Sequence, residues 1–277
     1  MFSLNTIKKT TPIRFIHISD THFGPEKDYE LYGVKTYPYA VKIVEAINDL
    51  PFTPDFIIHT GDITQTHLEP KAYQLAASVF ASLKAPVYYV TGNHDTSENI
   101  LRYLPMGKRE LLTESKTINS YRLDIQGVRF LTLDARGPDE IDPHGVLSDE
   151  QLRILTEEVS RGKQPLIIFI HFPALPLDSI WLDRDMLLFN GDDFHALLTR
   201  AKDRLCGVFF GHVHRGMQVY RDGILYSSAG SSFCQFYSYP FQEKPFDSDL
   251  PHQTGTGFFN IVTVTSEQTT VKEMWIR

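Results

Sequence analysis

Cysteine is scarce in this chain, and its scarcity excludes a disulfide scaffold. Only Cys206 and Cys234 occur among 277 residues, whereas small secreted domains that depend on disulfides carry several pairs. We therefore expect both thiols to be reduced and buried.

Long apolar runs are missing as well. The longest, Leu166–Ile170, falls far short of the about 20 residues that a membrane span needs.

An excess of basic residues is also absent. The chain carries 27 Lys and Arg against 34 Asp and Glu, for a formal charge of −7. This balance argues against nucleic acid or an anionic membrane as the main partner. Residues 1–11 contain no apolar stretch of about 7–15 residues before a cleavage site, so no secretory signal is visible. These absences together favour a cytoplasmic enzyme.

Hydrophobic residues make up 42% of the chain, which is typical of an ordinary globular protein. Short apolar runs rich in β-branched and aromatic residues predict buried strands at Arg14–Ser19, Asp55–Thr60, Pro86–Thr91, Leu166–His171 and Leu205–Gly211. Apolar spacing of helical period, and a capping box formed by Ser148 and Gln151, predict helices between them at Tyr39–Leu50, Lys71–Leu83, from Ser148 to about Ser160, and at Asp192–Lys202.

Alternating segments predict antiparallel hairpins: Ser120–Asp124 with Val128–Asp134 around Gln126-Gly127, then Gly216–Ser228 with a turn near Asp222-Gly223, then Phe258–Trp275 with a turn near Gln268. Parallel βαβ units combined with hairpins imply an α/β architecture with two mixed sheets. We expect one domain over residues 1–277, in which residues 230–277 form a C-terminal extension packed on the rest. Phe241–Gly257 lacks periodicity and predicts a long surface loop.

The most informative pattern lies at the ends of the buried strands. Each strand runs directly into acidic, amide or imidazole side chains. Because open α/β sheets bind ligands outside the carboxyl ends of their strands, these residues should converge on one crevice. They are Asp20 and His22, Asp62, Asn93-His94-Asp95, His171, and His212 with His214.

This set of side chains predicts a metal centre. Residues i and i+2 of an extended chain share a face, so Asp20 with His22, and His212 with His214, can point into one site. Carboxylate, amide and imidazole ligands suit Mn, Fe or Zn ions. Seven such ligands exceed what one ion takes. They fit two ions about 3.5–4 Å apart, the arrangement that catalyses phosphoryl transfer.

The ordered motifs D-x-H, GD, GNHD, H and GHxH resemble those of the calcineurin-like metallophosphoesterase superfamily. Three further segments are similar to its bacterial cyclic-AMP phosphodiesterase branch: Pro143-His144-Gly145, His171-Phe172-Pro173 followed by Trp181-Leu182-Asp183, and Ser231–Phe236. The resemblance implies a four-layer αββα sandwich and two metal ions per chain, Mn²⁺ and/or Fe, with Zn²⁺ as an alternative.

The resemblance also implies roles for individual residues. Asp20, His22, Asp62 and His214 would hold the first ion; Asp62, Asn93, His171 and His212 would hold the second, with Asp62 bridging. His94 would face the phosphate and stabilise charge or protonate the leaving alkoxide. Together with Asp62 and Asn93 it forms the expected catalytic set. Asp95 either orients nearby backbone or is a turn residue.

Other histidines and tyrosines have less specific interpretations. We expect His17 and His59 in the core, and we expect His67, His195 and His252 at the surface. His144 lies in a loop typical of the family without a predicted direct role. Tyr32, Tyr37 and Tyr39 either stack on a nucleobase or serve core or surface packing.

The favoured function is hydrolysis of a small phosphate diester, with 3′,5′-cyclic AMP as the substrate that the resemblance implies. Residues 63–65 and 96–98 lack the arginines with which protein phosphatases bind a monoester dianion. The alternatives are a broad-specificity enzyme for other small diesters, or a non-catalytic scaffold that would be expected to have lost ligands. The sequence leaves a homodimer open.

Overall fold

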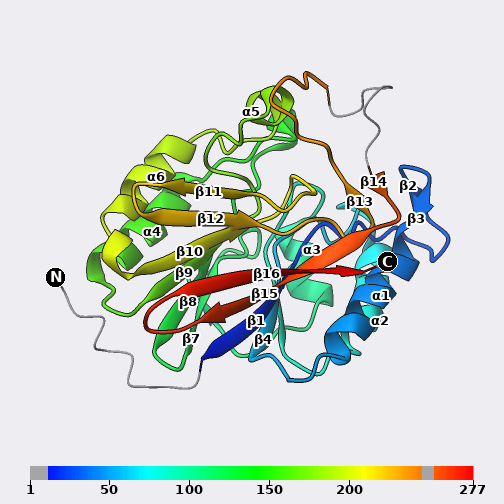
Figure 1. Ribbon diagram of the computed structural model, residues 1–277, viewed down its shortest axis with the longest axis horizontal. Coiled ribbons are helices and arrows are strands. Elements are labelled where there is room, and N and C mark those ends of the chain that lie inside the picture. The colour runs from blue at the N-terminus through cyan, green and yellow to red at the C-terminus, as the bar shows by residue number, and fades with distance from the viewer. Residues whose placement is uncertain (1–11, 245–252, 277) are drawn as a thin grey trace.

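The computed structural model describes residues 12–244 and 253–276 of the chain. Residues 1–11 and residues 245–252 lie outside this part. The second segment belongs to the expected Phe241–Gly257 loop and includes His252. Within the described part, two mixed β-sheets pack face to face between helices, with α1 (Thr36–Asn48) and α2 (Pro70–Phe80) on one flank and α4 (Asp149–Arg161) and α6 (Gly191–Thr199) on the other (Figure 1). The predicted α/β class with two mixed sheets is confirmed.

The first sheet has five strands in the order β16-β15-β1-β4-β5. β1, β4 and β5 are parallel, and β15 is antiparallel to β1 with Ile13 opposite Val264. Three of the predicted strands and the last predicted hairpin form this sheet. Its strands are β1 (Ile13–Ile18), β4 (Phe56–His59), β5 (Val87–Tyr89), β15 (Gly257–Val264) and β16 (Thr269–Ile276).

The second sheet has seven strands in the order β11-β12-β10-β9-β8-β7-β6. Its centre is parallel and its two ends are antiparallel hairpins. The strands are β6 (Glu110–Leu111), β7 (Tyr121–Ile125), β8 (Val128–Thr132), β9 (Leu166–Phe169), β10 (Leu205–Phe210), β11 (Gln218–Arg221) and β12 (Ile224–Ser228). Two small pairs complete the described strands: β2 (Glu30–Leu31) with β3 (Val34–Lys35), and β13 (Cys234–Gln235) with β14 (Gln253–Thr254).

The four predicted helices are present with shifted ends: α1 (Thr36–Asn48), α2 (Pro70–Phe80), α4 (Asp149–Arg161) and α6 (Gly191–Thr199). Ser148 caps α4 by accepting from the backbone N–H of Gln151, but the Gln151 side chain accepts from Ser120 instead of closing a capping box. Sequence reasoning missed α3 (Ser97–Tyr103), α5 (Ile180–Asp185) and the 3₁₀ turns Asp139–Ile141 and Lys202–Arg204. These elements are too short to show a helical period.

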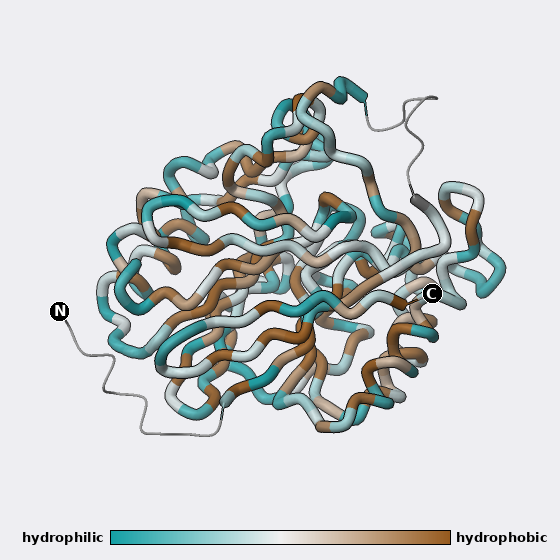
Figure 2. Tube along the Cα trace, viewed as in Figure 1, coloured by the Kyte–Doolittle hydropathy of each residue, from teal (hydrophilic) through white to brown (hydrophobic). Residues whose placement is uncertain are grey.

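Three apolar clusters fill the spaces between the layers. The middle cluster joins the two sheets through aromatic rings such as Phe15, Phe56 and Phe169. A second lies between the five-stranded sheet and α1–α3, and a third between the seven-stranded sheet and α4–α6. The central strands are accordingly hydrophobic along their length, whereas the outer helices alternate (Figure 2). The four-layer αββα sandwich that the family resemblance implied is therefore confirmed.

Two-residue turns close the hairpins of the second sheet as predicted. Gln126 and Gly127 have φ of 50° and 84°, and Asp222 and Gly223 have 53° and 85°. A positive φ at both central residues fits the twist of the flanking strands, and it explains the glycines.

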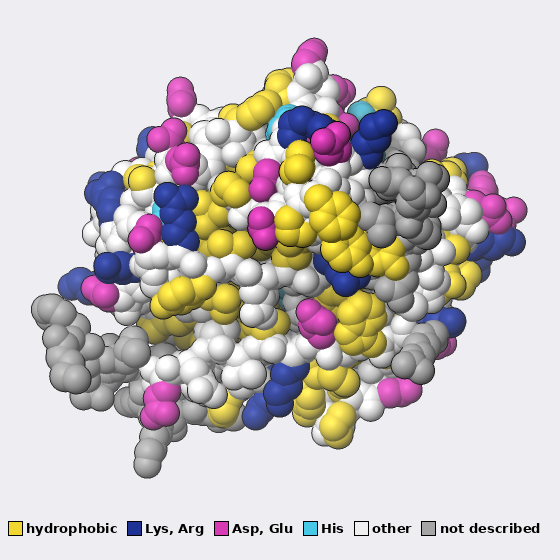
Figure 3. Space-filling model, turned by 45° about the horizontal axis from the view of Figure 1, so that its top comes forward, with side chains coloured by type: hydrophobic (Ala, Val, Ile, Leu, Met, Phe, Trp, Pro, Cys, Tyr) yellow, Lys and Arg dark blue, Asp and Glu magenta, His cyan; other side chains and the backbone are white. Residues whose placement is uncertain are grey.

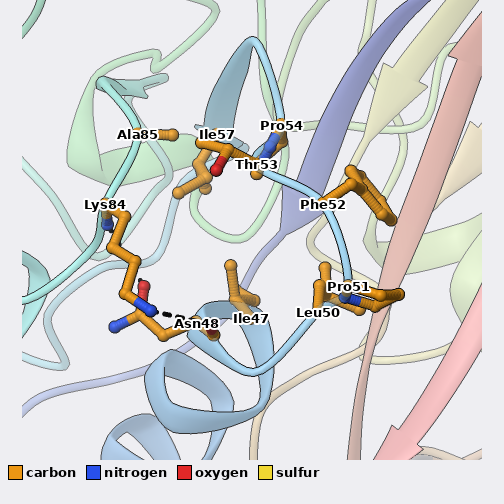
Figure 4. A pocket seen from close by; sticks show the side chains of 10 residues that line it. All are labelled: Ile47, Asn48, Leu50, Pro51, Phe52, Thr53, Pro54, Ile57, Lys84 and Ala85. Atoms are coloured by element: carbon orange, nitrogen blue, oxygen red, sulfur yellow. Dashed lines mark hydrogen bonds between the residues drawn. The ribbon is translucent and has the colours of Figure 1, made fainter.

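A hollow at the opposite ends of the parallel strands from the acid-and-imidazole clusters is lined mainly by apolar residues at the ends of α1, β4 and β5 (Figure 4). Its main polar groups already bond to each other: Lys84 donates through Nζ to the Asn48 carbonyl, and its backbone N–H donates to Asn48 Oδ1. This hollow therefore offers no reactive set of side chains.

Candidate metal centre

The acid-and-imidazole clusters come directly after β1, β4, β5, β9 and β10, and the structure gathers them at one edge of the sandwich. Nine described non-glycine residues have positive φ, and five of them are predicted ligands. Such backbone conformations cost free energy and concentrate at functional sites. The five are Asp20, His22, Asp62, His212 and His214.

Six of the predicted ligands form two groups that share Asp62. In the first, Asp20, His22, Asp62 and His214 each offer an atom within 4.8 Å of the others; in the second, Asp62, His171 and His212 do so. All six side chains are buried. The amide oxygen of Asn93 joins the second group, 3.2 Å from His171 Nε2. The structure thus brings together all seven residues.

The donor set of the second group fits a cation. His171 Nδ1 lies 2.7 Å from the Thr60 carbonyl oxygen, so it carries a proton and donates. In the neutral ring, Nε2 then presents a lone pair. It faces Asp62 Oδ2 at 3.3 Å, Asn93 Oδ1 at 3.2 Å and His212 Nδ1 at 3.1 Å. Lone pairs that converge in this way repel one another unless a positive charge lies between them.

The first group has the same property. Nε2 of His22 and Nε2 of His214 are 2.9 Å apart. Oδ2 of Asp62 lies 3.7 Å from Nε2 of His22, and Oδ1 of Asp20 lies 3.5 Å from Nε2 of His214. Mixed oxygen and imidazole ligands without thiolates suit Mn, Fe or Zn. The residues therefore fit a dinuclear metal centre.

Burial sets the electrostatics of these groups. It raises the pKa of Asp20 to about 8 and lowers the pKa of His214 to about 3. For His171, burial opposes the charged form, but the carboxylates of Asp62 and Asp20 and the Thr60 carbonyl together outweigh it and raise the pKa to about 9. The buried carboxylates thus require a positive charge, which bound metal can supply in place of a proton.

His94 stands beside the ligands and is half-buried. Its backbone N–H donates to Asp62 Oδ1 at 2.9 Å, and its ring lies 5.1 Å from that of His22. Nδ1 is 3.0 Å from the Gln65 carbonyl oxygen, which makes Nδ1 the donor and fixes the ring. Nε2 is then left for another partner, and only the doubly protonated ring can donate from it.

Asp95 orients backbone, which decides between its two interpretations. Its buried carboxylate accepts from the N–H groups of Ile63 and Gly92 through Oδ2, and from that of Thr64 through Oδ1, each at 3.1 Å. One side chain thereby joins the loop after β4 to the loop after β5. The relative position of Asp62 and Asn93 depends on this connection.

Arg136 was not anticipated from the sequence. It lies after β8, and its Nε donates to the backbone carbonyl of Asn93 at 3.3 Å, while the same guanidinium pairs with Asp139. It therefore braces the Asn93–His94 loop from outside. An isolated arginine outside the metal motifs gave no signal of this role.

The segment Ser231–Phe236 packs directly against the ligands. Ser231 Oγ donates to the backbone carbonyl of Asp20 at 2.8 Å. The ring of Phe236 lies flat on His214, with centroids 4.2 Å apart and planes at 1°. The segment that is similar to the cyclic-AMP phosphodiesterase branch therefore holds two predicted ligands, Asp20 and His214, in place.

A pocket of about 200 Å³ opens onto the ligand edge. One half is polar, lined by Asp62, Asn93, His94 and the imidazoles. The other half is largely apolar, and its residues come from four separate segments that sequence analysis did not connect: Tyr32, Pro143, Trp181, Asp185, Met186 and Phe236.

The expectations for His17 and His59 are confirmed, the one for His195 is wrong, and His67, expected at the surface, is half-buried. His17 and His59 are buried, each with a hydrogen bond, to Thr60 and Thr21 respectively. His144 bonds to the Leu187 carbonyl and stacks on Phe189. His195, expected at the surface, is only 3% exposed, because Tyr226 and Asp222 bind its two ring nitrogens and offset the cost of burying it.

Some of the expectations for the cysteines and tyrosines are confirmed and others are not. Both cysteines are free thiols; Cys234 is buried, but Cys206 is only partly so. Tyr37 and Tyr39 pack against the apolar clusters, whereas Tyr32 lines the pocket.

The part of the chain that the structure describes has no helix that is both long and apolar enough to cross a bilayer.

This arrangement of ligands and fold agrees with the comparison to known families. The model of the calcineurin-like phosphoesterase family matches residues 13–216, so the chain belongs to this family. The structure is also similar to a dimetal phosphatase from Danio rerio, with a TM-score of 0.66, 14% identity, and coverage of 94% of this chain and 99% of that one. At this identity the likeness concerns the fold.

Two relatives have higher sequence identity. The chain is 30% identical over 226 residues to the 3′,5′-cyclic adenosine monophosphate phosphodiesterase CpdA of Vibrio vulnificus, covering 81% of this chain and 78% of the relative. It is 29% identical over 244 residues to the glycerophosphodiester phosphodiesterase GpdQ of Enterobacter lignolyticus, covering 86% and 85%. The predicted resemblance to the cyclic-AMP phosphodiesterase branch is confirmed.

Proposed function

We propose that the protein is a dinuclear metal-dependent phosphodiesterase whose substrate is a 3′,5′-cyclic nucleotide such as cyclic AMP. The observation that carries the proposal is the pair of ligand groups that share Asp62 and border a pocket that is partly apolar. Similarity to CpdA supports the cyclic nucleotide. The scaffold alternative is disfavoured because all seven ligands and His94 are in place.

Asp20, His22, Asp62 and His214 would hold one ion, and Asp62, Asn93, His171 and His212 the other. When bound, such ions activate water for attack on phosphorus and neutralise charge on the phosphate oxygens. We infer Mn²⁺ and/or Fe, with Zn²⁺ as the alternative. Asp95 and Arg136 keep the Asn93–His94 loop in place against the loop that carries Asp62.

His94 would act on the leaving group. With Nδ1–H held by the Gln65 carbonyl, the doubly protonated ring presents Nε2–H toward the pocket. It can donate that proton to the departing ester oxygen, or stabilise the charge that develops there. Asp62 positions this ring through its hydrogen bond to the His94 N–H.

A small soluble diester suits the surface better than nucleic acid. On the face seen in Figure 3, Lys and Arg side chains are interspersed with Asp and Glu, whereas a nucleic-acid groove gathers positive charge. A cytoplasmic location and a homodimer stay predictions.

A second candidate substrate class is glycerophosphodiesters, favoured by the 29% identity to GpdQ over the larger share of both chains. The test is a substrate profile of the purified protein on cyclic nucleotides, glycerophosphodiesters and a chromogenic aryl diester, with metal analysis of the same sample. The highest kcat/KM on a cyclic nucleotide supports the proposal. The highest value on a glycerophosphodiester replaces it with the second candidate.

A further inference from the structure

The apolar half of the pocket contains three aromatic rings that differ in how they are held. Trp181 and Phe236 are almost fully buried. Trp181 donates from Nε1 to the Tyr237 carbonyl, and Phe236 lies flat on His214. Their centroids are 5.7 Å apart. These two rings form a fixed wall directly next to a predicted metal ligand.

Tyr32 is the exposed ring of the three. It is 37% exposed, and its ring is 5.9 Å from that of Phe236 and 6.4 Å from that of Phe233. It belongs to the same pocket as Asp62, Asn93 and His94. A flat group next to a bound phosphate would therefore meet Tyr32.

The backbone of Tyr32 gives an independent indication. Tyr32 and Gly33 are the two central residues of the β2–β3 hairpin, with φ of 53° and 76°. This turn favours Asn or Asp at its first position, because a positive φ crowds the Cβ of a bulky side chain. The equivalent turns of the chain carry Gln126 and Asp222. An aromatic residue at such a position is costly to the fold, and such costs are typical of functional sites.

The charge of the pocket limits what it accepts. Among the described residues that line it, none is Lys or Arg. The more exposed of its two carboxylates, Asp185, is engaged by the guanidinium of Arg184. The apolar half thus suits an uncharged flat group and offers nothing to a second phosphate.

We propose that Tyr32 is a specificity-determining residue: its exposed ring forms a stacking surface for an aromatic ring, a nucleobase or aryl group, attached to one side of the substrate phosphate. Phe236, inclined at 74° to Tyr32, and Trp181, inclined at 66° to Phe236, line the pocket beside it. This inference rests on the proposed function for the position of the phosphate. Stacking of a base on an aromatic side chain changes binding by about tenfold or more. The contact selects ring-bearing diesters over glycerol diesters.

The test compares Tyr32→Asn with Tyr32→Phe. Tyr32→Asn removes the ring and suits the turn, so its thermal midpoint should equal or exceed that of the parent. Its kcat/KM should fall at least about tenfold on cyclic AMP and bis(4-nitrophenyl) phosphate, and less than about twofold on glycerophosphoethanolamine. Tyr32→Phe should retain the parent values. Gln126→Asn is the matched control, since it places Asn at a similar turn far from the pocket and should alter no substrate ratio.

Inhibition by adenosine tests the stacking surface without hydrolysis of a cyclic nucleotide. Its inhibition constant against the aryl diester should rise about tenfold in Tyr32→Asn and stay unchanged in Tyr32→Phe. If the parent protein does not hydrolyse cyclic AMP, the proposed function fails, while the aryl diester and adenosine still test this inference. Equal losses on ring-bearing and glycerol diesters, or an unchanged adenosine constant, would overturn it.

Discussion

The backbone N–H of His94 donates to Oδ1 of Asp62 at 2.9 Å, while Oδ2 of the same carboxylate faces His171 at 3.3 Å and His22 at 3.7 Å. One oxygen therefore positions the residue that would act on the leaving group, and the other faces both ligand groups. Any substitution of Asp62 acts on two parts of the mechanism. Only a pair of variants can separate them.

Asp62→Ala should abolish diester hydrolysis and lower the metal content to one ion per chain or fewer, because Asp62 is shared by both ligand groups. Asp62→Asn keeps an oxygen for the His94 N–H but loses the charge, so it should retain the fold and still lose metal. The control is Asp192→Ala, an exposed carboxylate on α6. Metal analysis with a kinetic assay checks both. Two bound ions with near-native turnover would show that Asp62 does not bridge.

His94→Ala should leave both metals bound, since His94 belongs to neither ligand group. Turnover of a cyclic nucleotide should fall about 10²–10⁴-fold, the usual contribution of a general acid or charge-stabilising donor. The loss should be smaller for a nitrophenyl diester, whose leaving group needs no proton. Turnover of both substrates and metal stoichiometry are the measurements.

The outcome at His94 distinguishes three roles. An equal loss on both substrates would leave His94 as a stabiliser of charge and not a proton donor. A loss of metal would add His94 to the ligands. A loss of turnover on the cyclic nucleotide alone, whose leaving group is a ribose oxygen, would agree with proton donation from Nε2.

Substrate charge gives a third prediction. Residues 63–65 and 96–98 contain no arginine, no Lys or Arg is among the described residues that line the pocket, and Arg136, which contacts the Asn93–His94 loop, is engaged by the Asn93 carbonyl and Asp139. A monoester dianion therefore lacks the cationic partners that it needs. We expect kcat/KM on aryl diesters to exceed that on matching monoesters at least about tenfold, or about 1.4 kcal/mol in barrier. A preference for the monoester would reassign the protein as a phosphatase.

Asp95→Asn should destabilise the protein by about 2–4 kcal/mol, because the new amide group points N–H donors at backbone N–H groups that need the carboxylate as their acceptor. Chemical denaturation in the presence of a chelator measures this effect apart from metal binding. Asp192→Asn is the control and should change the free energy of unfolding by less than about 0.5 kcal/mol. A change at Asp95 equally small would mean that the loops do not depend on this side chain.

Both cysteines should resist alkylation in the native protein. Burial raises the pKa of Cys206 to about 11 and the pKa of Cys234 to about 12, and the thiolate is the reactive form. At neutral pH we expect labelling by iodoacetamide at least about 100-fold slower than after denaturation. Mass spectrometry of samples labelled before and after unfolding provides the measurement. Rapid native labelling of Cys206 would identify an activated thiol.

Sequence reasoning succeeded where a pattern had a local physical cause. Glycine beside Gln126 and Asp222 marked hairpin turns, and buried strands showed as apolar runs. The ligands were found because each comes directly after such a strand, and the edge of a parallel sheet then brings them together. The grouping of Asp20 with His214, almost two hundred positions apart, also requires the packing of the two sheets, because β1 belongs to the five-stranded sheet and β10 to the seven-stranded one.

Contact between irregular segments could not be predicted from the sequence. Tyr32, Trp181 and Phe236 meet in the pocket although no periodicity links a hairpin tip, a six-residue helix and the segment after β12. His195 was misplaced because its burial depends on Asp222 and Tyr226, partners that its own helix does not reveal. Arg136 acts through a backbone carbonyl, which leaves no trace in side-chain patterns.

The pairing of β1 with β15 also has a consequence for how the protein is made. Asp20 and His22 follow β1 directly, yet the antiparallel neighbour of β1 is β15. Val264 of β15 lies opposite Ile13 of β1, although it comes about 250 residues later in the chain. As the polypeptide leaves the ribosome, this edge of β1 stays unpaired until the segment that forms β15 has been synthesised. Contacts this distant in sequence form slowly. We therefore expect metal to bind only after β15 has been synthesised.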